Sequence, residues 1–142
     1  MKWATWQDIG VDRMACIWLI QRHIDPAAEF VFFPSQSSAP ADAEPFDIPG
    51  VRFTHRRGHA TFHALVADHT LNDPVLARIA AIVDEADIIQ PVTVEPAAPG
   101  LDLLCRGVRR NSADDSEAAR RGCQLFDALY AQLRAESEGE GL

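Results

Sequence analysis

The stretch VDRMACIWLIQRHI at residues 11–24 decides the fold of this chain. Within it, residues 14–20 form a run of seven uncharged, apolar residues. A helix that is apolar on nearly every side has to be surrounded by other elements, so we predict a central, buried helix with Trp18 in its core. Asp12 near its start suits the helix dipole, and Asp25-Pro26 ends it because proline disfavours the helical conformation in the preceding residue.

Two strand patterns follow the central helix. Residues 29–33 (EFVFF) are aromatic and β-branched, and residues 51–55 (VRFTH) alternate between apolar and polar side chains. Both patterns favour strands. We expect these two strands to pair as a small ribbon that rests on the helices, because two strands alone are not stable in water.

The remaining helices are predicted from local patterns. Asp73-Pro74 is typical of a helix N-cap followed by a first-turn proline, and apolar residues recur at helical spacing after it. The other helices are predicted over 59–69, over about 101–108, and after Ser112, which with Asp115 approximates a capping box. The fold class is therefore mainly α (α+β), with about five helices packed around a buried first helix and a small two-stranded β-ribbon.

Length and composition indicate one domain. A chain of 142 residues with 47% hydrophobic residues matches a single core, which normally serves about 100–150 residues. We assign residues 1–135 to this domain. Residues 136–142 contain three glutamates and two glycines, so we expect them to form a solvated, disordered acidic tail.

Charge and hydropathy restrict the partners. The net charge of −8 argues against nucleic acid as a partner of this chain alone, because such binding needs clustered Lys and Arg. We expect a cytoplasmic protein that does not enter membranes, since the chain shows neither a signal peptide nor the ~20 apolar residues that span a bilayer. The oligomeric state is left open. Three widely spaced cysteines predict free, buried thiols at Cys16, Cys105 and Cys123.

Three segments follow one another in a fixed order: residues 11–30, residues 45–55, which begin with PFDIPG, and FDALY at residues 126–130. Together they resemble the C-terminal domain family of ChrB-type chromate resistance proteins. The likeness extends over about residues 11–133, and its first segment is the most specific. It implies a role in chromate resistance, in which full-length members are regulators with an additional N-terminal domain. We do not expect that domain in this chain.

The chain departs from this family pattern beside His55. Family members tend to have a cysteine before a Ser/Thr-Phe pair and an acidic residue after it, whereas this chain reads Ala60-Thr61-Phe62-His63. Thiol chemistry at that cysteine position is therefore not expected here. A metal-ligand role is retained, because histidine can replace a carboxylate as a ligand.

A histidine series forms the first candidate site. His55, His59 and His63 are spaced by four residues, and the last two would present their imidazoles on one face of a helix. We predict one transition-metal ion, Fe, Mn or Zn, with His55 and His63 converging on it. The alternative is that these histidines are structural and bond backbone groups or solvent. The resemblance supplies three carboxylate candidates for the same site, Asp12, Asp47 and Asp127.

Asp12-Arg13 and Cys16 form a second candidate site, for a small oxyanion such as chromate. The free N–H groups at the start of a helix and a guanidinium suit an oxyanion, although the charge of Asp12 competes for the same donors. The alternative is an internal cluster in which a carboxylate from another segment holds Arg13. Cys16 would be a reducing thiol if exposed and inert if buried.

Two classes of function stay open. The first is a module of chromate or metal-stress resistance that senses or binds an oxyanion or a metal ion. The second is a metal-dependent enzyme, including one of redox type, with a His-rich site around His55 and His63. A redox metal retained at one equivalent would favour the enzyme.

Overall fold

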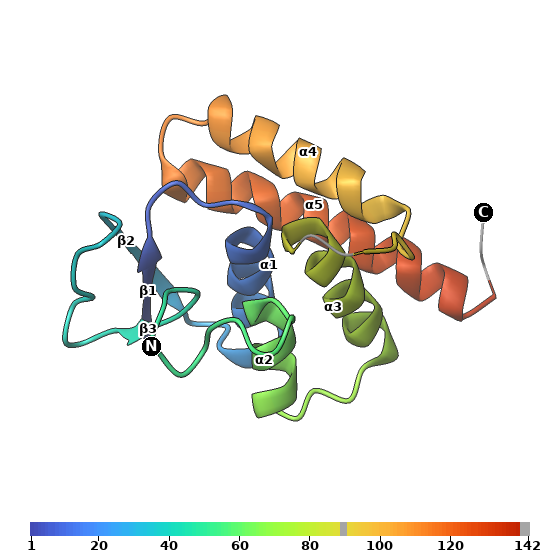
Figure 1. Cartoon of the computed structure of the whole chain (residues 1–142), viewed down its shortest axis with the longest axis horizontal. Coiled ribbons are helices and arrows are strands. Elements are labelled where there is room, and N and C mark those ends of the chain that lie inside the picture. Colours follow the sequence, from blue (N-terminus) through green and yellow to red (C-terminus); the bar gives the residue numbers. More distant parts are fainter. Residues whose placement is uncertain (89–90, 140–142) are drawn as a thin grey trace.

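The computed structural model describes residues 1–88 and 91–139. Helices dominate, and a small sheet lies beside them (Figure 1). The elements in chain order are β1 (Lys2–Trp6), α1 (Val11–Leu19), the π-helix η1 (Ile20–Ile24), β2 (Glu29–Phe33), β3 (Glu44–Pro45), α2 (Thr61–Asp68), α3 (Pro74–Asp87), α4 (Ala97–Arg110) and α5 (Asp115–Ser137).

Helix α1 lies in the middle of the molecule and contacts each of the other α-helices (Figure 1). Every one of its residues except Arg13 is buried. Trp18 is only 1% exposed, and Ile20, the first residue of η1, is fully buried. The prediction of a central helix from the apolar run is therefore confirmed.

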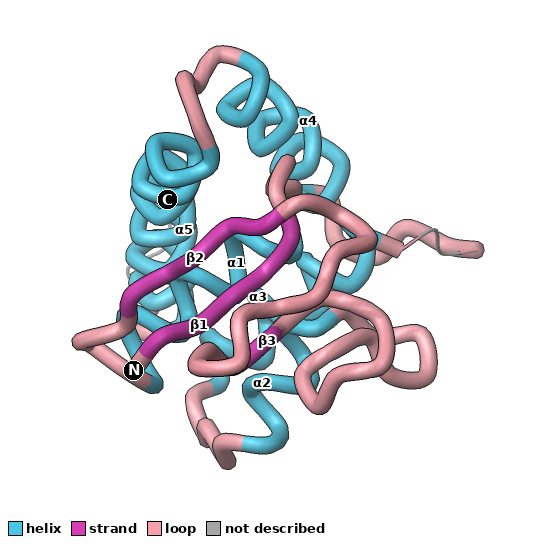
Figure 2. Tube along the Cα trace, turned by 90° about the vertical axis from the view of Figure 1, so that its left-hand side faces the viewer, coloured by secondary structure: helices cyan, strands magenta, loops and turns pink. Residues whose placement is uncertain are grey.

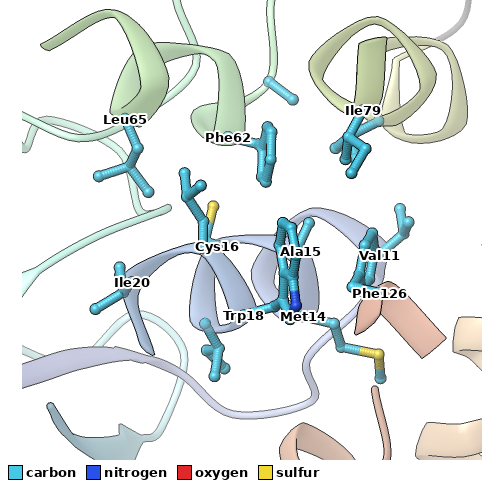
Figure 3. Close-up of a cluster of buried hydrophobic side chains, with 14 of the residues drawn as sticks. Val11, Met14, Ala15, Cys16, Trp18, Ile20, Phe62, Leu65, Ile79 and Phe126 are labelled. Atoms are coloured by element: carbon cyan, nitrogen blue, oxygen red, sulfur yellow. The ribbon is translucent and has the colours of Figure 1, made fainter. Parts of the chain in front are cut away.

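Side chains from three helices pack on α1 (Figure 3). The Trp18 ring lies at centroid distances of 6.4 Å from Phe62 and 6.0 Å from Phe126. Helix α5 approaches α1 so closely at Gly122 that a Cβ there would stand 2.9 Å from Met14 Sδ. Figure 3 shows the contributions of Phe62 and Leu65 from α2, Ile79 from α3 and Phe126 from α5.

The sheet corrects the predicted two-stranded ribbon. It has three parallel strands in the order β2-β1-β3, and it covers one side of the helices (Figure 2). The predicted strand 51–55 is absent, apart from a single bridge between Phe53 and Phe46. Residues 2–6 take its place beside β2, because α1 and η1 provide the crossover that joins two parallel strands. Strand β1, whose middle three residues are all buried, was not predicted from the sequence.

Local signals at the helix ends were partly correct. Asp73 is the N-cap of α3, as predicted, and its side chain accepts a hydrogen bond from Val75 N–H at 2.8 Å. Helix α5 has Asp114 rather than Ser112 as its N-cap. Asp114 accepts from Glu117 N–H at 2.9 Å, and the Glu117 side chain accepts from Ala113 N–H at 2.7 Å. The three cysteines are free and buried, as predicted.

The C-terminal segment is helical for longer than expected. Helix α5 continues through Ser137, two residues into the expected tail, while residues 140–142 lie outside the described residues. None of the described helices combines the length and the apolar character that crossing a bilayer would require.

Replacing Trp18 tests the central role of α1. Trp18→Ala should lower the free energy of unfolding by about 3–5 kcal/mol, because it empties an aromatic core site. Trp18→Phe should cost less, since it keeps a ring in the core and loses mainly the 2.8 Å hydrogen bond from Nε1 to Asp127. Urea unfolding measures both, and equal stabilities of Trp18→Ala and wild type would contradict this packing.

Candidate metal centre

Asp12 links the first two helices. It sits in the first turn of α1 and is only 2% exposed. Its two carboxylate oxygens accept hydrogen bonds from Thr61 N–H at 2.9 Å and from Phe62 N–H at 3.0 Å. These are the first N–H groups of α2, whose N-cap Ala60 offers no side-chain acceptor, so Asp12 caps α2 from another helix.

Asp47 is held over α1 by an unusual backbone conformation. Its φ of +54° lies in the left-handed region, which aspartate tolerates better than most residues. Its N–H donates to Phe53 O at 2.8 Å, and its C=O accepts from Arg13 Nη2 at 3.0 Å. The Arg13 Nε atom also lies 3.0 Å from Asp47 Oδ2, so a carboxylate of another segment holds Arg13, as predicted.

A tight turn presents His55 to these carboxylates. Arg57 and Gly58 both have positive φ, and Arg56 and His59 exchange backbone hydrogen bonds of 3.0 and 2.8 Å across them. This is the pattern of a type I′ turn, which reverses the chain within two residues. The turn therefore carries the chain from His55 to Ala60, directly before the residues that bond to Asp12.

Three carboxylates surround one nitrogen of His55. Its Nε2 atom lies 3.1 Å from Asp87 Oδ2, 3.2 Å from Asp12 Oδ2 and 3.5 Å from Asp47 Oδ1. We call these four residues the carboxylate–histidine cluster. They line a pocket of about 260 Å³ together with Gly10 and Arg13, and the His55 side chain is 47% exposed at its mouth.

The pKa values of the four cluster residues are shifted, because the three acids are buried or partly buried and lie close to one another. Burial would raise the pKa of Asp12, but hydrogen bonds from His55 and from the backbone of Phe62 and Thr61 outweigh burial and lower it. Burial and then the charge of Asp12 raise the pKa of Asp47 well above its usual range, and the same two causes raise the pKa of Asp87. The hydrogen bond to Asp12 is the main reason that the pKa of His55 rises to about 9.

His59 and His63 lie together, and His59 is paired with a different acid. Helix α2 begins at Thr61, so His59 stands in the turn before it. Its ring stacks on that of His63 at a centroid distance of 3.8 Å, and its Nδ1 lies 2.6 Å from Asp84 Oδ2. Among the described residues, the group whose ligand atoms gather closely enough for a metal is Asp12, His55 and Asp87.

The other predicted site residues have structural partners. Asp127 on α5 accepts hydrogen bonds from Trp18 Nε1 at 2.8 Å and from the Arg22 guanidinium at 3.0 and 3.1 Å, and it lines a different pocket. Cys16 is fully buried, and burial, followed by the charges of Asp12 and Asp47, raises the pKa of its thiol well above the usual value. A thiol in this state is a poor nucleophile and reductant.

Asp87 was missed by the sequence analysis. It belongs to the motif DEAD at residues 84–87, in the last turn of α3, where negative charge opposes the helix dipole. Acidic residues at the C-terminal end of a helix were the one feature of the sequence that could have pointed to Asp87. From the sequence alone, this pattern is typical of a solvent-exposed helix end. Only the packing of α3 beside α1 brings Asp87 to the cluster.

The model of the ChrB C-terminal domain family matches residues 3–133. The chain belongs to the ChrB C-terminal domain family. Protein ChrB of Cupriavidus metallidurans (strain CH34) is 35% identical over 133 residues, which cover 93% of this chain and 40% of the relative. This domain thus spans less than half the length of that relative. No solved structure matches the chain.

The donor set of this ChrB C-terminal domain fits a metal ion. Two ligands that bind one ion at about 2.0–2.2 Å lie about 3.0–3.5 Å apart when they are neighbours in its coordination shell. The distances of 3.1 and 3.2 Å from His55 Nε2 to Asp87 and Asp12 fall in this range, and the ligand atoms of these three residues all lie within 4.8 Å of one another. Carboxylates suit Mn²⁺, and an imidazole suits Fe²⁺ or Zn²⁺.

Asp12→Asn tests the link between the cluster and the fold. Asparagine has one acceptor oxygen, while Thr61 and Phe62 donate to different oxygens of Asp12. One buried N–H therefore loses its partner, and we expect the free energy of unfolding to fall by about 2–4 kcal/mol in urea denaturation. Asp42→Asn, which removes an exposed partner of Lys2, is the control that should leave stability nearly unchanged. Equal stability of the two variants would show that Asp12 does not cap α2.

Proposed function

We propose that this domain is a metal-binding module of chromate or metal-stress resistance, with one divalent Mn, Fe or Zn ion held by the carboxylate–histidine cluster. The observation that carries the proposal is the approach of three carboxylates to one imidazole nitrogen at 3.1–3.5 Å. The membership in the ChrB C-terminal domain family supports the role in chromate resistance.

The charge of the cluster supports a dication as the ligand. When a metal ion displaces the protons of His55 and of the carboxyl groups, the three carboxylates and the guanidinium of Arg13 carry a net charge of −2. Asp12 is fully buried and Asp47 largely so, and uncompensated charge at such positions is costly. A divalent ion would balance both charges, whereas chromate would add to them.

The carboxylates of Asp12 and Asp47 oppose the binding of an oxyanion at Asp12-Arg13. Asp12 takes up the first N–H groups of α2, and Arg13 is paired with Asp47. Cys16 is buried and bonded to Asp12 at 3.6 Å. These contacts favour the metal ion over the oxyanion as the ligand of this site.

The open side of the pocket supports an exchangeable coordination position. His55 is half exposed there, so solvent or a small ligand can reach an ion held beside it. A sensor needs this access to respond to its signal, and an enzyme needs it to bind a substrate. The metal-dependent enzyme is therefore our second candidate, with His55 rather than His63 as its histidine ligand.

Metal titration of the full chain tests the proposal. After treatment with a chelator, isothermal titration calorimetry with Mn²⁺, Zn²⁺ or anaerobic Fe²⁺ should show one equivalent bound. Asp87→Asn should weaken binding at least about tenfold, and His55→Ala should weaken it by about a hundredfold or more. Circular dichroism checks that both variants fold. Asp87→Asn is the variant less expected to disturb the fold, because the polar partner described for Asp87 is His55 alone.

Matched variants place the ion at the cluster. His63→Ala and Asp127→Asn remove the same chemical groups elsewhere and should leave the affinity unchanged. A wild-type protein that binds none of these ions would refute the proposal. So would loss of binding in His63→Ala together with normal binding in His55→Ala.

A further inference from the structure

Three arginines share one face of α4. Arg106, Arg109 and Arg110 stand at positions i, i+3 and i+4 in its last turns, which places them side by side. They line a pocket of about 220 Å³ with residues 8–11, Asp87 and Asp102. Of the carboxylate–histidine cluster, only Asp87 lines this pocket.

Two of these guanidiniums pair with carboxylates, and the third belongs to an exposed residue, Arg110. Arg106 Nε donates to Asp102 at 2.9 Å, and Arg109 Nη1 donates to Asp8 at 3.2 Å. Arg110 has no carboxylate within 4.0 Å among residues 1–88 and 91–139. A guanidinium carries five N–H donors, so all three side chains retain donors for a ligand.

The arginine pocket adjoins the pocket of the cluster. Gly10 and Asp87 line both of them. A Cβ added at Gly10 would meet nothing within 4 Å, so no side chain fills the space beside this residue of the shared wall. One ligand can therefore reach both a cation at the cluster and the arginines.

We propose that Arg106, Arg109 and Arg110 form an anion subsite beside the metal, which binds a tetrahedral oxyanion group. One oxygen of this group contacts the metal, and the others accept hydrogen bonds from the arginines. The proposal rests on the cation site proposed above. The group is either a free oxyanion or the phosphate of an ester, and the two sources share this chemistry.

The metal and the anion should bind cooperatively. Without a cation, the carboxylate of Asp87, which lines both pockets, repels an anion at the shared wall. A bound dication removes this repulsion and adds a ligand position. Because coupling between two ligands is reciprocal, the anion must tighten metal binding by the same factor.

Calorimetry with two probes tests the subsite. Sulfate serves as the free oxyanion and phenyl phosphate as the ester, each titrated into the full chain with and without Mn²⁺. We expect at least one probe to bind about tenfold or more tightly when Mn²⁺ is present, and Mn²⁺ to bind more tightly by the same factor when that probe is present. Stronger binding of sulfate identifies a free oxyanion as the ligand, and stronger binding of phenyl phosphate identifies an ester.

Two variants separate this subsite from the metal site. Arg110→Gln should weaken binding of the probe about tenfold and leave Mn²⁺ affinity in its absence unchanged. Gly10→Val should abolish the coupling, because its side chain fills the space beside the shared wall. The matched control is Arg120→Gln, an exposed arginine of α5 that lines another pocket.

The outcomes distinguish the two proposals. One equivalent of Mn²⁺ with no coupled binding of either probe would overturn the anion subsite and leave the metal site intact. The same holds if Arg110→Gln and Arg120→Gln bind the probe equally well. If wild type binds no metal ion at all, both proposals fall.

Discussion

The structure depends on one buried carboxylate. Asp12 stands in the first turn of the central helix, and both of its oxygens bond to the start of α2. A buried charge is tolerated only when such donors compensate it. The position of α2 relative to α1 therefore follows from Asp12. The turn that precedes α2 then brings His55 to the same carboxylate.

Four segments far apart in the sequence supply the cluster. Asp12 comes from α1, Asp47 from the loop after β3, His55 from the turn before α2, and Asp87 from the end of α3. Packing of apolar side chains around α1 brings together three acids that are far apart in an unfolded chain and that repel one another in the folded one. The hydrophobic core thus offsets the electrostatic repulsion between these acids, which a bound cation would relieve.

The sequence predicted the parts of the fold that depend on local pattern. The apolar run of α1 and the Asp73 cap need no knowledge of distant residues, and both were correct. The strand β1 was missed because its partner β2 lies beyond the whole of α1, and parallel pairing leaves no local turn signal. A contact of that kind becomes visible only once the chain is folded.

The candidate site was predicted in part for the same reason. His55, Asp12 and Asp47 were named as candidates, and the structure brings them together. The assumption of a helix from residue 59 was wrong, since α2 begins at Thr61 and His59 pairs with Asp84 instead. Asp87 could not be predicted as a site residue, because no periodicity in the sequence shows which residue of α3 faces the start of α1.

The central claim is that His55 provides the histidine ligand of a metal ion organised by Asp12. Pulsed electron paramagnetic resonance of the Mn²⁺-loaded protein, with ¹⁵N-labelled histidine, counts the imidazole nitrogens coupled to the ion. The account predicts one coupled imidazole. Two coupled imidazoles, or a bound ion with none, would contradict it.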